Sequence, residues 1–185
     1  MAEDPATAWN GVYCLREYNP WTFGGARNPK FDKTWDGRLL DFKEGKAYAI
    51  KAETEEFAKG LEALKLPKGT ILVVVPGHEA RQSNAGRPLA IVAESLAADG
   101  RYQACVNMLV RTKTISKLAK GGDRSVDQQL DTMKVTKPDA LNGKTVVILD
   151  DTVTTEGSIT AARTLLAKAG VAVAAIGLAR TVKYF

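Results

Sequence analysis

The chain has few of the side chains on which metal sites and disulfide frameworks depend. Its 185 residues include one histidine and two cysteines, Cys14 and Cys105, which lie far apart and form no Cys-x-x-Cys motif. These numbers argue against a zinc site and favour two reduced thiols in a cytoplasmic protein. No apolar run approaches the roughly 20 residues of a membrane span, and the N-terminus lacks the pattern of a signal peptide, so no membrane partner is expected.

Neither sign of charge dominates the composition. The 26 basic and 21 acidic side chains give a net charge of +5, and 45% of the residues are hydrophobic, as in one globular domain of ordinary size. A modest positive charge suits an anionic small molecule as partner, and nucleic acid is the less favoured partner.

The first 45 residues differ from the rest because they hold most of the aromatic side chains, interrupted by prolines and glycines. Short strands and turns are expected there, with a loop tip over residues 24–29. We interpret residues 1–45 as a small aromatic-rich flap packed on a main domain of residues 46–185, since a disordered tail would not carry so many rings. The alternative is that the rings bury a homodimer interface. The rings in this segment belong to Trp9, Tyr13, Tyr18, Trp21, Phe23, Phe31, Trp35 and Phe42.

Apolar runs and helical patterns alternate along the main domain. Amphipathic helices are expected over residues 52–66 and 88–98, and a third helix carries the apolar face between residues 159 and 169. The strands are expected near residues 71–75, 104–110, 145–149 and 171–178. Continuous apolar runs are typical of strands buried on both faces, so the pattern predicts a single α/β domain with a mainly parallel sheet flanked by helices.

Three features suited to a sugar phosphate follow the apolar run 146–149. Asp150 and Asp151 come directly after it, and two carboxylates at a strand end can bind vicinal hydroxyls or a magnesium ion. The small residues that follow leave backbone N–H groups free to face a phosphate, and the next helix adds its unpaired N–H groups and the positive end of its dipole. This loop comprises Thr152, Val153, Thr154, Thr155, Glu156, Gly157 and Ser158. A simple helix cap would explain neither the acidic pair nor the small residues.

Residues 146–158 resemble the phosphoribosyl-pyrophosphate (PRPP) loop of type I phosphoribosyltransferases. That family pattern has four apolar residues, two acidic residues, two variable residues, and then Thr-Thr-Gly-x-Thr or a close variant. Glu156 stands where the family usually has glycine, with no residue inserted. A glutamate there could turn outward and still donate its N–H group, or it could repel the 5′-phosphate, and it enters glycine-only backbone regions only with strain.

Two further loops have chemistry suited to pyrophosphate. Pro76, Gly77, His78 and Arg81 follow the strand at residues 71–75, and this segment resembles the family's pyrophosphate-binding loop, with arginine suited to bidentate phosphate contacts. His78 also fits the role of an ordinary turn residue. The basic segment 111–124 lies where the family has a flexible loop that closes over pyrophosphate, although basic runs are often solvated surface. Its candidate contacts are Lys117 and Arg124.

The three segments together resemble ComF-like phosphoribosyltransferases in order and spacing over roughly residues 48 to 182, although this chain lacks the N-terminal zinc-binding cysteine cluster of ComF proteins. The resemblance implies transfer of phosphoribosyl from PRPP to a nitrogen acceptor, with magnesium held mainly by substrate oxygens. Asp150 and Asp151 would bind the ribose hydroxyls, directly or through waters of the Mg²⁺ ion, and act in catalysis with Lys117 and Arg124. Thr154, Thr155, Gly157 and Ser158 would bind the 5′-phosphate together with the start of the next helix.

Two alternatives remain open at this stage. A regulatory protein that senses PRPP or a ribose-phosphate nucleotide needs only the loop after the acidic pair. A ComF-like nucleic-acid accessory protein would use the basic segment and the aromatic N-terminus. The acceptor is not defined by any motif, and we expect the N-terminal rings and the C-terminal Tyr184 and Phe185 to border the cleft and select it.

Overall fold

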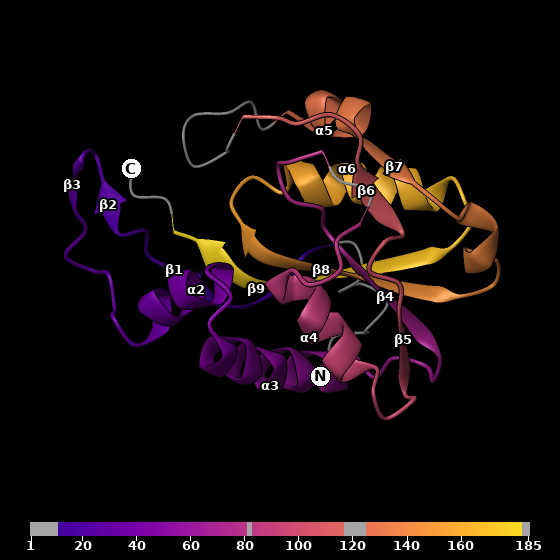
Figure 1. The fold of residues 1–185 in the computed structure, drawn as a ribbon, viewed down its shortest axis with the longest axis horizontal. Helices are drawn as coiled ribbons and strands as arrows, with labels where there is room; N and C mark the ends of the chain where they lie inside the picture. Colours follow the sequence, from indigo (N-terminus) through magenta and orange to yellow (C-terminus); the bar gives the residue numbers. More distant parts are fainter. Residues whose placement is uncertain (1–10, 81–82, 117–124, 183–185) are drawn as a thin grey trace, which may run out of the picture.

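A computed structural model describes residues 11–80, 83–116 and 125–182 of the chain (Figure 1). Six of the residues named above lie outside the described residues: Trp9, Arg81, Lys117, Arg124, Tyr184 and Phe185.

A five-stranded sheet with the order β1-β9-β8-β4-β5 forms the centre of the fold. Its strands are β1 (Tyr13–Tyr18), β4 (Thr70–Val74), β5 (Tyr102–Ala104), β8 (Thr145–Val153) and β9 (Ala172–Thr181). Each strand pairs in parallel with its neighbour. The expectation of a single α/β domain with a mainly parallel sheet is therefore confirmed.

Helices cover both faces of this sheet (Figure 1). They include α3 (Ala47–Ala63) and α4 (Pro88–Leu96) on one face and α6 (Gly157–Ala167) on the other. Because side chains alternate across a strand, Leu72 and Val74 of β4 pack with α3 and α4, whereas Ile71 and Val73 pack with α6. Burial of the whole of β4 accounts for the apolar run of residues 71–74 within it.

The N-terminal segment is joined to the sheet. Residues 13–18, expected to belong to the flap, form the edge strand β1, with Tyr18 opposite Thr181 of β9. The hairpin of β2 (Thr22–Phe23) and β3 (Ala26–Arg27) then turns at two glycines with positive φ, as expected for the loop tip. Helix α2 (Trp35–Lys43) follows and buries Leu39 and Phe42 in the same core as α3.

The single strand expected over residues 104–110 is wrong, because the chain forms two strands there. β5 ends at Ala104, and β6 (Leu109–Arg111) pairs in antiparallel fashion with β7 (Met133–Val135) in a separate two-stranded sheet. Asn84 explains the break, since its side-chain amide donates to the carbonyls of Val106 and Leu109 at 2.8 Å each. A distant asparagine thus replaces the ladder bonds that a continuous strand would need.

The remaining elements are short or begin earlier than the sequence suggested. α3 starts five residues before the expected position 52, and the helices α5 (Val126–Thr132) and η2, a 3-10 helix (Pro138–Leu141), were not expected. In the part of the chain that the structure describes, no helix is long and apolar enough to cross a membrane.

The sheet has a point where two neighbouring strands send their connections in opposite directions. β4 and β8 are paired up to Val74 and Leu149, but β4 leads to β5 at one edge and β8 leads to β9 on the other side. Ligands of open parallel sheets bind beyond the carboxyl ends of such a strand pair. Asp150 is the first residue of β8 after its pairing with β4 ends.

Candidate active site

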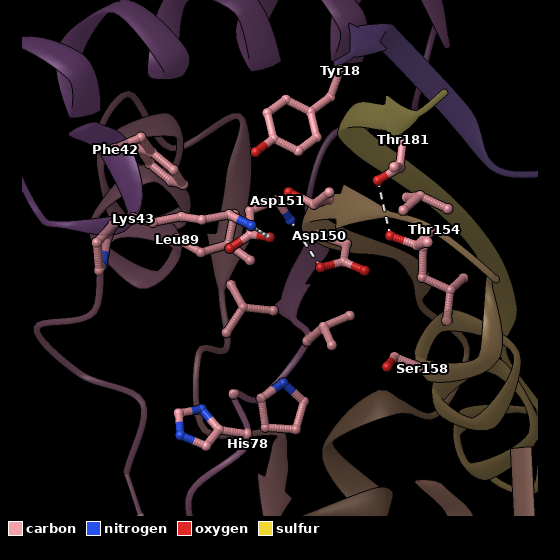
Figure 2. A pocket seen from close by; sticks show the side chains of 18 of the residues that line it. Tyr18, Phe42, Lys43, His78, Leu89, Asp150, Asp151, Thr154, Ser158 and Thr181 are labelled. Atoms are coloured by element: carbon pink, nitrogen blue, oxygen red, sulfur yellow. Dashed lines mark hydrogen bonds and ion pairs between the residues drawn. The ribbon is translucent and has the colours of Figure 1, made fainter. Parts of the chain in front are cut away.

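A cleft of about 780 Å³ opens at this point of the sheet. Its volume is within the range of roughly 300–1,000 Å³ that is usual for small-molecule sites. The predicted residues Pro76, Gly77 and His78 and all of residues 150–158 line it. Figure 2 shows Asp150 and Asp151 at its centre, Phe42 and Lys43 on one side, Thr154 and Ser158 on the other, and His78 below.

The acidic pair forms the floor of the cleft. The backbone N–H group of Asp151 donates to Oδ1 of Asp150 at 2.9 Å, which fixes the orientation of that carboxyl group. Burial, and then the neighbouring carboxylate of Asp151, raise the pKa of Asp150 to about 8, against the opposing effect of Lys43 and of backbone N–H groups. Both effects favour the protonated form of the Asp150 carboxyl group.

Lys43 is a site residue that the sequence did not reveal. It lies in the last turn of α2, and its Nζ is 3.4 Å from Oδ1 of Asp151. Burial lowers the pKa of this lysine, but Asp151, Tyr18 and Asp150 together raise it by more, so the net shift is upward and the ammonium group stays charged. No motif marks Lys43, because its place depends on the pairing of β1 with β9 and on the packing of α2.

The phosphate turn, residues 152–158, connects β8 to α6. Since α6 begins at Gly157, the first N–H groups of the helix have no partner within it and are directed to its N-terminal end. The hydroxyl groups of Thr154 and Thr181 are 2.9 Å apart and hold the turn to the end of β9. Val153 lines the cleft, but its side chain packs in the core. This end of the cleft can bind a phosphate group.

Glu156 occupies the N-cap of α6 with φ 60°, a left-handed conformation that favours glycine. Its Oε1 is 2.8 Å from Nη1 of Arg180 at the end of β9, and both side chains are about two-fifths exposed. The negative charge of Glu156 beside the phosphate turn is thus offset by the positive charge of Arg180.

The loop after β4 is backed by two arginines. The guanidinium group of Arg87 packs so closely on Gly77 that a Cβ atom at residue 77 would overlap it. Arg111 is 3% exposed, and its Nε donates to the carbonyl of Gly77 at 2.9 Å. Burial, and then the charge of Arg87, lower the pKa of Arg111 to about 10, so it remains charged at neutral pH. The pattern of apolar residues did not reveal the burial of Arg111, because in the sequence Arg111 is the first residue of a basic segment that resembles solvated surface.

Rings from the N-terminal segment border the opposite wall. Tyr18, Trp21 and Phe42 line the cleft, with Leu40 and Leu89 beside them. The guanidinium carbon of Arg27 lies 4.8 Å from the centre of the Trp21 ring, an arrangement that fixes this exposed side chain. The expectation that N-terminal rings reach the cleft therefore agrees with their positions.

The donor set is also informative about metal binding. Within residues 11–80, 83–116 and 125–182, no three His, Cys, Asp or Glu side chains form a group that could hold a metal ion. Asp150 and Asp151 alone suit a magnesium ion that takes its remaining ligands from substrate and water.

Comparison with protein-family models gives no match for this chain, and no curated protein matches it significantly.

Proposed function

We propose that the protein is a phosphoribosyltransferase that binds PRPP with magnesium, transfers the phosphoribosyl group to a nitrogen acceptor and releases pyrophosphate. One observation carries the proposal: an acidic pair, a free helix N-terminus and an arginine-backed loop line one cleft at the strand ends. These three features suit, respectively, the ribose hydroxyls, the 5′-phosphate and the pyrophosphate of one molecule. If the three features bound three separate ligands, they would not need to line the same cleft.

The acidic pair has the chemistry to hold the ribose. The 2′- and 3′-hydroxyl groups are each donors and acceptors. Carboxylate oxygens can accept from them, and the raised pKa of Asp150 favours a protonated carboxyl that can donate to them. Lys43 limits the negative charge at this point through its contact with Asp151. Magnesium, when bound, supplies positive charge to the diphosphate oxygens and meets these carboxylates mainly through water.

The helix end and the arginine-backed loop suit the two charged ends of the substrate. The first N–H groups of α6, that of Ser158 included, would donate to the 5′-phosphate. Arg87 and Arg111 would stabilise the charge that develops on pyrophosphate as the bond between C1′ and its oxygen breaks. The acceptor nitrogen then forms the new bond to C1′ and gives up its proton to solvent.

The wall formed by N-terminal rings suits the acceptor. Tyr18 and Trp21 offer ring faces and edges beside the acidic pair, and planar nitrogen heterocycles pack well on such rings. A planar acceptor therefore agrees better with this wall than a flexible amine does.

Calorimetry with PRPP and MgCl₂, followed by an assay of pyrophosphate release with a panel of nitrogen heterocycles, tests the proposal. The wild-type protein should bind PRPP, and the double variant Asp150→Asn, Asp151→Asn should bind at least tenfold more weakly while it stays folded. Binding without pyrophosphate release from any acceptor would favour a PRPP sensor. Equal affinity in the wild type and the double variant would refute the assigned site.

A further inference from the structure

The buried arginine behind the loop after β4 has three neutral partners. Nε of Arg111 donates to the Gly77 carbonyl, Nη1 donates to Oγ1 of Thr132 at 2.6 Å, and Nη2 donates to Oε1 of Gln129 at 2.9 Å. No described carboxylate forms an ion pair with Arg111 or with Arg87. A buried charge usually has an opposite charge beside it, because desolvation is costly. The guanidinium group of Arg111 instead keeps its positive charge with neutral partners around it.

We propose that Arg111 is a positioning residue that presents the backbone of residues 77 and 78 to the pyrophosphate end of the substrate, and that neutral Gln129 keeps its charge uncompensated. This inference rests on the proposed function, since it names what the loop after β4 receives. Arg111 and its three partners come from three separate segments, namely β6, α5 and the loop after β4, so their meeting depends on the tertiary fold. The side chain of Arg111 acts on the substrate through the backbone of the loop after β4.

The geometry of the Gly77 peptide explains how this works. In a trans peptide the C=O and N–H groups point in opposite directions. Because the Gly77 carbonyl accepts from Arg111, the N–H group of His78 points away from Arg111, and both residues line the cleft. Among the described residues this N–H group has no acceptor. A guanidinium on the carbonyl side also polarises the peptide, which makes the N–H end a better donor to an anion.

Gln129 links this loop to the phosphate turn. It is fully buried on α5, and its Oε1 also accepts from Oγ of Ser158 at 3.3 Å. Arginine only donates, so the side-chain oxygen of Gln129 has to face Arg111. Its Nε2 is then buried without an acceptor among the residues that the structure describes, an arrangement that costs stability. A glutamate at this position would pair with Arg111, and the glutamine leaves the charge available to a ligand.

The variant Gln129→Glu tests the role of the charge with little change of shape. Calorimetry should use pyrophosphate with MgCl₂ for one end of the cleft and ribose 5-phosphate for the other. We expect affinity for pyrophosphate to fall at least tenfold. Affinity for ribose 5-phosphate should fall severalfold less, because the phosphate turn meets residue 129 only through the Ser158 hydroxyl. Gln103→Glu is the matched control, because it adds the same charge at an exposed position on β5 and should change neither affinity.

A second variant covers the case in which Gln129→Glu does not fold. Arg111→Lys keeps the positive charge but cannot reach three acceptors with a planar fork, so pyrophosphate affinity should again fall selectively. Unchanged pyrophosphate affinity in a folded variant would overturn the inference. If the wild type binds neither pyrophosphate nor ribose 5-phosphate, the proposed function itself fails, and the two failures are thereby distinguished.

Discussion

Glu156 and Arg180 form an ion pair of 2.8 Å that joins the N-cap of α6 to the end of β9. The pair places a carboxylate at the one position of the phosphate turn where a left-handed backbone favours glycine. Exposed ion pairs contribute only about 0–1 kcal/mol to stability, so the pair does not explain the strained backbone by itself. Its effect on the charge near the phosphate is the more informative property.

The variant Glu156→Gly should bind PRPP several-fold more tightly. It removes a negative charge beside the 5′-phosphate, frees Arg180, and relieves a left-handed conformation that costs a non-glycine residue roughly 1–2 kcal/mol. Calorimetry and thermal unfolding would measure both effects. Arg180→Met is the reciprocal variant, and it should weaken PRPP binding because Glu156 is left unpaired. A marked loss of affinity in Glu156→Gly would instead assign Glu156 a positive role in binding.

Lys43→Met should lower the magnesium concentration required for half-maximal PRPP binding. The substitution removes a cation that contacts Asp151 and competes with the metal for the same carboxylate. Lys46→Met is a suitable control, because Lys46 pairs with Asp41 and Glu44 away from the residues that line the cleft. A magnesium titration that is the same in Lys43→Met and Lys46→Met would show that the contact has no influence on the metal.

The contribution of Asp150 to the stability of the protein, measured in EDTA, should decrease as the pH rises from about 4 to about 8. The pKa of Asp150 is raised in the folded state to about 8, above its ordinary value of 3.8. The stability that the protonated group contributes is therefore fully present below pH 3.8 and is lost as the pH rises through about 8. The slope from this group is at most about 1.4 kcal/mol per pH unit. Asp150→Asn should flatten the curve of melting temperature against pH. An identical slope in wild type and variant would contradict the shifted pKa.

Gly77→Ala should weaken pyrophosphate binding while the protein remains folded. The new methyl group would overlap the end of the Arg87 side chain, which is flexible enough to move away without disturbing the core. Gly11→Ala serves as control, because a Cβ atom there meets no neighbour. Calorimetry with pyrophosphate and MgCl₂ compares the two, and equal affinities would show that the contact of Arg87 with Gly77 is dispensable.

The loops at the ends of β4 and β8 could be predicted from sequence because each follows a continuous apolar strand, and parallel strands bring their carboxyl ends to one edge. The contacts of Lys43, Arg180 and Arg111 could not be predicted in this way. Lys43 depends on β1 joining β9, and the burial of Arg111 depends on acceptors from two other segments, the loop after β4 and α5. Local periodicity contains no information about such long-range pairs.

A crystal structure grown with PRPP and MgCl₂ tests the central claim most directly, because the claim assigns each part of one ligand to one part of the cleft. We expect the 5′-phosphate at the N-terminus of α6, the ribose hydroxyls on Asp150 and Asp151, and the diphosphate beside Gly77 and His78. PRPP bound in the reverse direction, or bound outside this cleft, would contradict it.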